Sequence, residues 1–475
     1  MLFNSLEYLI FLPVCFLLYW FVFKKHLQIQ NALVLVASYV FYGWWDYRFL
    51  GLIVFSTLID YAVGLQLRKA KSNTRRKGWL LVSLLVNLGL LGVFKYYNFF
   101  VESWVIAWEA LGVTMEMSTL KLILPVGISF YTFQTLSYTV DVYREKLEPT
   151  PNLLAFASYV AFFPQLVAGP IERATRLLPQ FSKKRDFDYD QAVSGMYLIV
   201  WGLFKKVVIA DNCAFFVNTI FDNPSGYSSL ELGLGAFLFA FQIYGDFSGY
   251  SDIAIGTARL FGFDLMTNFK FPYFAKNIGD FWRRWHISLS TWFRDYVYIP
   301  LGGSRGSRVQ QIRNVTIIFF VSGFWHGANW TFIIWGGIHA LFFIPLLLLK
   351  RNRADVHTRH IVWTDSWRML GTFVLVTLAW IYFRADTVTL AHEYILHMFG
   401  NVTFDVSLFT QSNKYVLYAV TCGFGILYLL GMEGLAYIRG KQEVHLNLWT
   451  AFVTIILISF LGAFQNPETF IYFQF

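Results

Sequence analysis

Residues 315–334 read VTIIFFVSGFWHGANWTFII, a run in which a single ionisable side chain, His326, interrupts an otherwise apolar sequence. An apolar run of about 20 residues is long enough for an α-helix to cross the hydrocarbon core of a bilayer. Because burying an ionisable group in such a helix costs free energy, the residue usually faces a polar cavity and is functional. The run therefore predicts a transmembrane helix with a functional histidine near its middle. The alternative is a neutral histidine that only joins this helix to a neighbouring one.

The whole chain has the composition of a membrane protein. Of its 475 residues, 56% are hydrophobic and 14% are charged, whereas about 25% of the residues of a soluble domain are charged. The net charge of +9 at pH 7 would point to nucleic acid in a soluble protein. Here the basic residues fall in short loops between apolar runs, where the positive-inside bias and anionic lipids account for them. We therefore expect membrane lipids, and no nucleic acid, as partners.

Apolar runs recur from one end of the chain to the other, and they predict an all-α, polytopic integral membrane protein. We expect about 11–13 helical spans in one membrane domain, residues 1–465, followed by a tail, residues 466–475. With the basic loops in the cytoplasm, both termini and the tail lie on the extracytoplasmic face. The first span lacks the basic start and the cleavage site of a signal peptide, so we expect it to be retained. The predicted spans are Leu9 to Phe23, Ala32 to Trp45, Leu50 to Leu65, Trp79 to Phe94, Leu153 to Ala168, Ala192 to Ala210, Leu232 to Tyr244, Val315 to Ile334, Ile338 to Leu349, Leu370 to Ile381, Tyr415 to Leu430 and Trp449 to Phe464.

The sequence offers no motif for a metal or a nucleotide. Cys15, Cys213 and Cys422 are far apart and predict neither a disulfide framework nor a thiolate metal site. The histidines include no close pair with metal-ligand spacing inside a span, so we expect no bound metal. Walker loops, HExxH helices and GxSxG elbows are also missing from the sequence, which leaves the ATPase, metalloprotease and serine-hydrolase classes without support.

Between residues 268 and 313 the apolar pattern gives way to a dense mixture of aromatic, basic and acidic residues. Such backbone persists at membrane depth only when it is buried in protein or lines a wet cavity, so we expect tilted or re-entrant helices here. Within it, residues 282–286 read WRRWH, and helical spacing would bring both tryptophans close to the histidine. Arg283 and Arg284 would suit an anionic ligand, such as a thioester donor that carries phosphates. The alternative is that these arginines are ordinary interfacial anchors.

Acidic residues form two further polar insertions. Asp246 and Asp252 lie in GDFSGYSD, residues 245–252, and Glu172 lies in GPIER, residues 169–173. We expect structural ion pairs from all three carboxylates, because an ionised carboxylate needs a partner inside a membrane protein. The alternative is that one of them orients a histidine.

Taken together, these motifs resemble the membrane-bound O-acyltransferase family, and the likeness runs from Phe3 to the last residue. The resemblance is strongest to the bacterial branch that contains the alginate O-acetyltransferase membrane subunit. The stretches that carry it are LPVGISFYTFQ (124–134), FPQLVAGPI (163–171), GDFSGYSD (245–252) and YIPLGGSR (298–305).

The resemblance implies a fold of tilted and re-entrant helices around a transmembrane tunnel. It implies that His326 is the catalytic histidine at the waist of this tunnel and that His286 is the second histidine below it. The donor, acetyl-CoA or an acyl-carrier thioester, would arrive from the cytoplasm as a substrate, and no cofactor would be bound permanently. We expect the donor to be held by Arg283, Arg284, Trp285 and Trp325.

The same resemblance implies where the acyl group goes. In this branch, at the bacterial inner membrane, it passes to an extracytoplasmic SGNH-hydrolase-like acetyltransferase partner that esterifies a polysaccharide such as alginate. The last residues, FIYFQF (470–475), resemble a C-terminal motif of envelope-acylating systems, which makes Tyr472 a candidate acyl relay. Its phenol, with a usual pKa of about 10, needs a base such as His326 to act as a nucleophile. The alternative is an aromatic tail that anchors at the membrane interface.

Three other functions remain open at this point. D-alanyl transfer to teichoic acid would use both histidines, but in such systems the tyrosine motif lies on a separate peptide, whereas here it is part of the chain. Acylation of lipids or proteins belongs to branches whose segments differ from those at residues 163 and 245. A transporter would also place histidine and arginine within the membrane.

Overall fold

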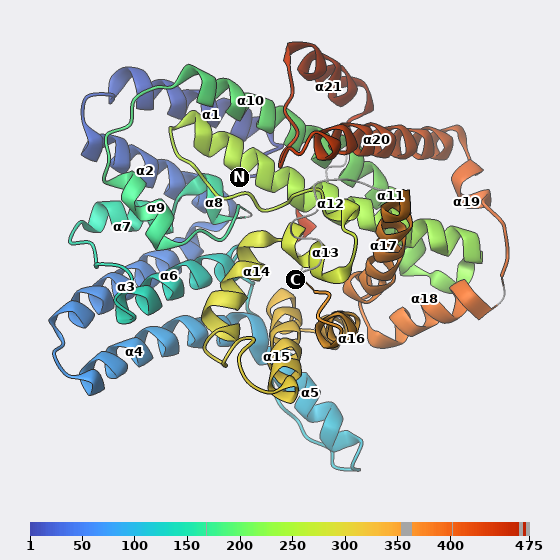
Figure 1. Cartoon of the computed structure of the whole chain (residues 1–475), viewed down its shortest axis with the longest axis horizontal. Coiled ribbons are helices and arrows are strands. Elements are labelled where there is room, and N and C mark those ends of the chain that lie inside the picture. Colours follow the sequence, from blue (N-terminus) through green and yellow to red (C-terminus); the bar gives the residue numbers. More distant parts are fainter. Residues whose placement is uncertain (168, 353–362, 401, 465–468, 472–475) are drawn as a thin grey trace. The chain divides into compact units, whose positions relative to one another are not determined.

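The computed structural model describes residues 1–167, 169–352, 363–400, 402–464 and 469–471, and every regular element within them is helical. The chain divides into two units, Met1–Met196 with Ala254–Met266, and Tyr197–Ile253 with Thr267–Phe475. The border between the units falls inside α10 (Tyr189–Leu203) and α12 (Ser229–Leu260). The prediction of an all-α protein is confirmed (Figure 1).

The described residues contain six helical stretches that are long and apolar enough to span a membrane. The longest, Leu27–Lys69, has 43 residues, about twice the 20 that one crossing needs. Polytopic membrane insertion is therefore confirmed, and the stretch Leu27–Lys69 contains two of the predicted spans. The six stretches are Leu27–Lys69, Asn73–Glu109, Tyr189–Asp222, Trp330–Leu348, Thr364–Arg384 and Asn413–Ile438, and shorter apolar helices are Leu6–Val22, Leu153–Leu166 and Leu448–Leu461.

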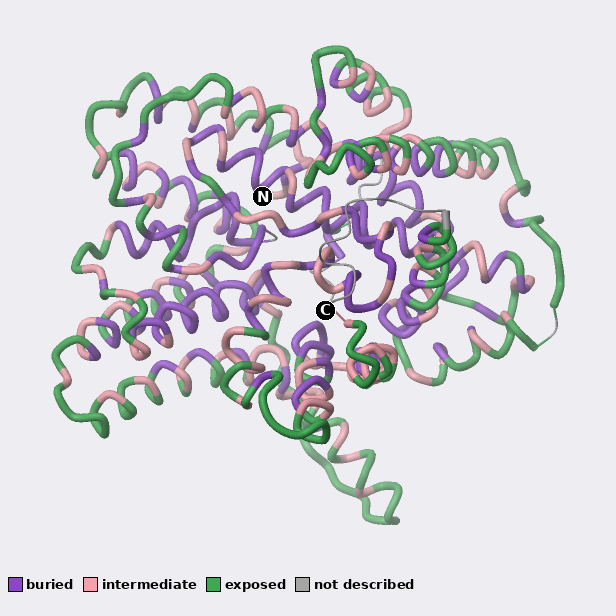
Figure 2. The backbone as a smooth tube through the Cα atoms, viewed as in Figure 1, coloured by how far each residue is buried: buried purple, intermediate pink, exposed green. Residues whose placement is uncertain are grey.

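The first unit is built around three helices that pack on one another: α3, α4 and α6. Figure 2 shows α6 buried along most of its length, whereas α4 and α5 are largely exposed. A buried carboxylate that the sequence analysis missed joins the three helices. Asp60 of α3 accepts hydrogen bonds from Ser83 and Asn87 of α4 and from Thr139 of α6, the kind of polar contact that holds helices together in a membrane. The helices of this unit before α10 are α1 (Leu6–Leu17), α2 (Leu27–Asp46), α3 (Leu50–Lys69), α4 (Asn73–Leu91), α5 (Tyr97–Glu109), α6 (Ile128–Tyr143), α7 (Leu153–Val160), α8 (Phe163–Leu166) and α9 (Ala174–Phe181).

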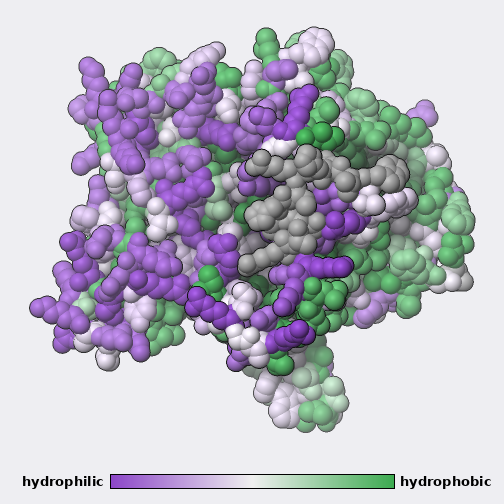
Figure 3. Space-filling view, in the orientation of Figure 1, coloured by the Kyte–Doolittle hydropathy of each residue, from purple (hydrophilic) through white to green (hydrophobic). Residues whose placement is uncertain are grey.

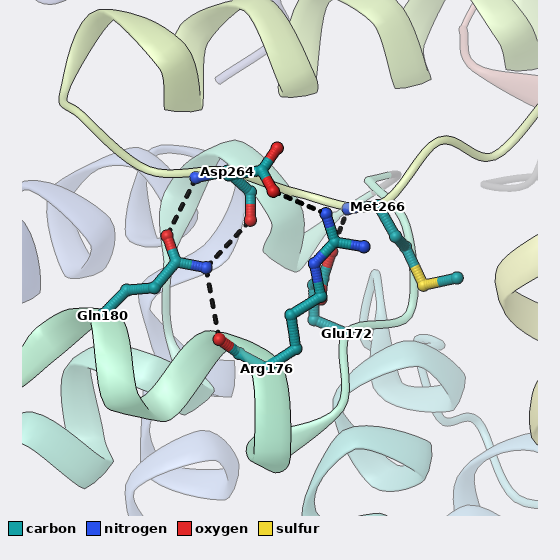
Figure 4. Close-up of polar contacts among 5 residues, drawn as sticks. All are labelled: Glu172, Arg176, Gln180, Asp264 and Met266. Carbon is teal, nitrogen blue, oxygen red and sulfur yellow. Dashed lines mark hydrogen bonds and ion pairs between the residues drawn. The ribbon is translucent and has the colours of Figure 1, made fainter. Parts of the chain in front are cut away.

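Glu172, which follows α8, joins its own loop to the loop that contains Met266 in the first unit. Its Oε1 accepts a hydrogen bond from the backbone N–H of Met266 (Figure 4). Beside it, Arg176 pairs with Asp264 at 2.7 Å, and Gln180 donates to the Asp264 carbonyl. The predicted ion pair of Glu172 is therefore replaced, in this network, by a hydrogen bond to backbone. The carboxyl group is fully buried, and this burial raises its pKa from 4.5 to about 7.

The second unit contains the helix pair α15 (Arg308–His326) and α16 (Trp330–Leu348). The predicted single span from Val315 to Ile334 is therefore wrong, because the chain turns between two helices at Gly327. Gly327 is extended, and the side chain of Asn329 accepts the N–H of Thr331 and so caps α16. The other elements of this unit are π-helical Phe204–Ala210, α11 (Asp211–Asp222), α13 (Ile278–Arg284), α14 (Ile287–Phe293), α17 (Trp363–Arg384), α18 (Val388–Gly400), α19 (Ser407–Thr410), α20 (Asn413–Ile438) and α21 (Leu448–Leu461).

Large apolar side chains cover part of the outside of the second unit. Figure 3 shows hydrophobic residues gathered over the region of α11 and α18. Leu396 and Phe399 of α18 and Leu417 of α20 are 61–70% exposed, a surface that suits contact with lipid tails. Inside the unit, Cys213 and Cys422 are hydrogen-bonded neighbours although they are far apart in the sequence.

The α15–α16 pair depends on glycines at its contact. A Cβ atom on Gly323 would lie 2.2 Å from the carbonyl oxygen of Phe332, and one on Gly336 would lie 2.3 Å from that of Phe319. Small residues of this kind let membrane helices approach closely. Gly323, which lies one helical turn before His326, therefore serves the packing of α15 against α16.

Replacing Gly323 with alanine should destabilise the protein, because the new methyl group would push α16 away from α15. We expect a loss of about 1–3 kcal/mol, seen as a lower midpoint of thermal unfolding in detergent. Gly337→Ala on α16 is the matched control, since its methyl group would meet only the Phe320 ring at 3.4 Å. Equal midpoints for the two variants would contradict this account.

Glu172→Gln should remove a pH-dependent loss of stability. Because burial raises the pKa of this carboxyl from 4.5 to about 7, the folded protein binds a proton that the unfolded chain has released, and stability falls as the pH rises through this window. As the pH rises from 4.5 to 7, the unfolding midpoint of the variant should therefore increase relative to that of the wild type. Asp264→Asn, which changes an exposed ion pair of the same network, should have little effect. A constant difference between Glu172→Gln and wild type across this window would refute the assignment.

Candidate active site

The second unit brings the two predicted histidines together. The ring centroids of His286 and His326 are 6.3 Å apart, and the two residues are 0% and 2% exposed. His326 is the last residue of α15, and His286 immediately precedes α14. The histidine predicted for the middle of a span therefore lies at a helix end, where the chain turns.

His286 has an unusual backbone conformation. The predicted helical spacing through residues 282–286 is wrong, because α13 ends at Arg284 and α14 begins at Ile287. His286 between them is left-handed, with φ 43° and ψ 54°. This conformation costs a residue other than glycine about 1–2 kcal/mol. Such strain persists where the surroundings hold it in place, and it concentrates at functional sites.

Asn268 fixes both the position and the tautomer of His286. Its Oδ1 accepts hydrogen bonds from the backbone N–H and the hydroxyl of Ser288, at 3.2 and 2.9 Å. These two donors identify the atom as oxygen, because the amide nitrogen could not accept them. The same Oδ1 lies 3.2 Å from Nδ1 of His286. Since Oδ1 can only accept, Nδ1 carries the proton and Nε2 is the basic nitrogen of the neutral ring.

Aromatic side chains surround the ring of His326. The ring centroids of Trp325, Trp335 and Phe383 lie 5.0, 5.1 and 5.4 Å from that of the histidine, all edge to face. These contacts fix the plane of the imidazole. They also make surroundings that exclude water from the ring.

The predicted donor-binding residues have varied surroundings. Arg283 donates to the carbonyl of Asn352 at 2.6 Å, and Nε of Arg284 lies 3.0 Å from the carboxylate of Asp280. Trp285 is fully buried among other aromatic rings, and Trp325 contacts the rings of both histidines. Their role in holding the donor stays a prediction.

The C-terminal tail returns to the second unit beside the histidines. Phe470 is fully buried, with its ring centroid 4.4 Å from that of Tyr250 and 5.9 Å from that of Phe247. The ring of Phe247 in turn contacts His286, at 4.6 Å. The described part of the tail is thus packed inside protein. Tyr472, the predicted relay, lies outside the described residues.

Buried ion pairs lie next to the tail. The predicted pairs of Asp246 and Asp252 are present, and their partners are Lys206 and Lys205, at 2.7 and 2.6 Å. Sequence reasoning missed both lysines, because they stand inside the apolar run from Ala192 to Ala210. Two consecutive lysines in a predicted span were the signal that could have found them.

Comparison with known proteins now identifies the family. Residues 34–392 match the family model described as MBOAT, membrane-bound O-acyltransferase family. The chain belongs to the membrane-bound O-acyltransferase family. It is 41% identical to the probable alginate O-acetylase of Pseudomonas aeruginosa, over 87% of this chain and 78% of that protein. It is 33% identical to the peptidoglycan O-acetyltransferase of Helicobacter pylori, over 100% of this chain and 98% of that protein.

A more limited likeness links the chain to a third relative. The teichoic acid D-alanyltransferase of Bacillus subtilis is 31% identical over 46% of this chain and 57% of its own length. The family assignment makes this protein a membrane acyltransferase, so the predicted enzyme class is confirmed and a passive transporter is excluded.

The contact between Asn268 and His286 generates a test of the site. Asn268→Leu should lower the rate of acyl transfer by about tenfold or more, because a misoriented ring loses much of the contribution of acid–base catalysis. Asn268→Asp, whose carboxylate accepts the same hydrogen bonds, should retain more activity. The measurement is the turnover of a labelled thioester by purified, folded protein. Full activity of Asn268→Leu would show that the tautomer of His286 does not matter.

Proposed function

We propose that this acyltransferase moves an acetyl group from a cytoplasmic thioester, acetyl-CoA or an acyl-carrier protein, across the bacterial inner membrane. The acetyl group then passes to an extracytoplasmic SGNH-hydrolase-like acetyltransferase, which esterifies a polysaccharide such as alginate. In this proposal both termini of the chain lie in the periplasm. The observation that carries the proposal is the buried pair His286 and His326, beside which the C-terminal tail is packed. The relatives named O-acetylase and O-acetyltransferase support acetyl as the group.

The chemistry has two steps, and both use His326. In the first, His326 removes the phenolic proton of Tyr472 while the phenolate oxygen attacks the thioester carbonyl. The C–S bond breaks, the proton passes from the histidine to the departing thiolate, and an aryl ester of Tyr472 forms. In the second, His326 removes the proton of an acceptor hydroxyl while the hydroxyl oxygen attacks this ester. The bond between the acyl carbon and the Tyr472 oxygen breaks, and the histidine returns the proton to the departing phenolate. Histidine is the side chain that most often carries out such proton transfers in enzymes.

The packing of the tail supports the relay over direct attack by the partner. The ring of Phe247 contacts both Phe470 and His286. A tail anchored at the membrane interface, the alternative that the sequence left open, would not need this burial.

D-alanyl transfer is the second candidate for the group moved. The D-alanyltransferase relative aligns with 46% of this chain, whereas the peptidoglycan O-acetyltransferase aligns with 100%. This difference favours acetyl. Supplying membranes with labelled acetyl and D-alanyl thioesters in parallel separates the two candidates.

Replacing His326 with alanine should abolish polymer acetylation, with a loss of at least about 10²-fold, because the general base is removed. Membranes are incubated with labelled acetyl thioester, and the C-terminal peptide is examined for a base-labile adduct. We expect the adduct in the wild-type protein and its absence from both His326→Ala and Tyr472→Phe. Retained acetylation by a correctly inserted His326→Ala protein would remove the role assigned to this residue.

Tyr418→Phe is the matched control for the relay, since Tyr418 lies in the same unit and its ring stacks on Phe215. The control should keep the adduct. If Tyr472→Phe also keeps normal acetylation, the acyl group passes directly to the partner, and the relay is wrong even though the reaction stands.

A further inference from the structure

Two glycines of α12 bring that helix into backbone contact with the segment that precedes α11. A Cβ atom on Gly245 would lie 2.8 Å from the carbonyl oxygen of Lys205, and one on Gly249 would lie 2.7 Å from that of Gly202. Because the backbones touch, short aspartate side chains on α12 can reach lysines on the facing segment. That segment, Phe204–Ala210, is a π-helical turn, a feature that often marks functional sites.

Lys206 lies at the centre of the resulting cluster. Its Nζ is 2.7 Å from Oδ1 of Asp246 and 2.8 Å from Oδ1 of Asp211, and all three side chains are at most 4% exposed. One buried cation thus faces two buried carboxylates. Removing these three charged groups from water costs more free energy than a single ion pair recovers. We therefore expect the cluster to have a role other than stabilising the fold.

The second oxygen of Asp246 holds the tail. Oδ2 accepts a hydrogen bond of 2.6 Å from the backbone N–H of Ile471. Lys206 thus holds Oδ1 of the carboxylate, and Oδ2 binds the backbone of Ile471, the residue before Tyr472. A bond from an N–H to a charged acceptor is stronger than one between neutral groups. Phe470, buried against Tyr250 and Phe247, adds an apolar contact on the preceding residue.

We propose that Asp246, held by Lys206, is a positioning residue that latches the C-terminal tail and so sets the place of the acyl relay at Tyr472. The latch itself requires only the contacts above, and its link to Tyr472 rests on the proposed function. A polar pocket lined by Lys206, Asp246, Gln242 and Arg384 borders the tail at Thr469 and Ile471. When the tail detaches, this pocket opens to solvent and Ile471 becomes accessible.

Accessibility of the tail tests the latch without any measurement of activity. In full-length protein, Ile471→Cys reports on the latch, because Ile471 is 3% exposed and the three native cysteines are buried. We expect slow maleimide labelling of this variant in detergent. Adding Asp246→Ala should raise the labelling rate by about tenfold or more, which corresponds to the loss of one charge-assisted hydrogen bond. Adding Asp246→Asn, which keeps an acceptor but loses the charge, should give an intermediate rate.

Two controls separate a latch from general loosening. Asp365→Ala removes a carboxylate from another buried ion pair of the same unit, with Lys276 at 2.7 Å, and should leave the labelling of Ile471→Cys slow. Thr469→Cys, at an exposed tail position, should label quickly in every background. An unchanged rate in Asp246→Ala, or an equal rise in Asp365→Ala, would overturn the latch.

Kinetics then connect the latch to transfer. In the folded Asp246→Asn protein, the rate of adduct formation at the C-terminal peptide should fall severalfold while the KM for the thioester stays unchanged, because the donor is bound elsewhere. A raised KM with an unchanged maximal rate would show that Asp246 does not position the relay. If no adduct forms at Tyr472 even in the wild-type protein, the relay fails, and the labelling result still decides the latch.

Discussion

Backbone contact at glycine is the constraint on which the candidate site depends. Apolar helices gain little by associating in lipid, because lipid tails are as apolar as their side chains, so close approach at small residues has to hold them together. At Gly323 the contact fixes the end of α15, and with it His326. At Gly249 the contact brings α12 against the segment that carries Lys206. Close backbone contact at glycine therefore places both His326 and the cluster of buried charges beside the tail.

Close contact also decides how buried charges are accommodated. Lys206 is balanced by Asp246 and Asp211 within 2.8 Å, whereas Asp60 in the other unit is held by hydroxyl and amide donors alone. Neutral donors suffice to join three helices. The costlier ionic arrangement occurs at Asp246, where one oxygen of the carboxylate faces Lys206 and the other accepts a hydrogen bond from the backbone of Ile471. The Asp60 network, with neutral donors, joins helices, whereas the Lys206 network, with paired charges, binds the backbone of the tail.

The sequence predicted those features that depend on residue identity alone. Composition identifies a membrane protein. The free-energy cost of burying an imidazole singles out His326, whether the residue lies in the middle of a span or at the end of a helix. The turn after His326 was missed because the length of an apolar run does not distinguish one span from two shorter helices; the available signals were Gly327 and the N-cap residue Asn329. Asn268 could not be found, because its contact with His286 depends on the tertiary path of a segment without regular structure.

The two histidines are held by different forces, and this difference bears on their roles. Hydrogen bonding to Asn268 and a left-handed backbone fix His286, so that its tautomer is set before any substrate arrives. The ring plane of His326 is fixed by edge-to-face contacts with Trp325 and Trp335, which do not specify a tautomer. A ring that must accept a proton and then release it benefits from such freedom, whereas a ring with a set tautomer is suited to orienting a neighbour. The geometry therefore favours His326 as the proton carrier and His286 as its support. The ring of Phe247 packs against both His286 and Phe470, so the tail and this histidine share one neighbour.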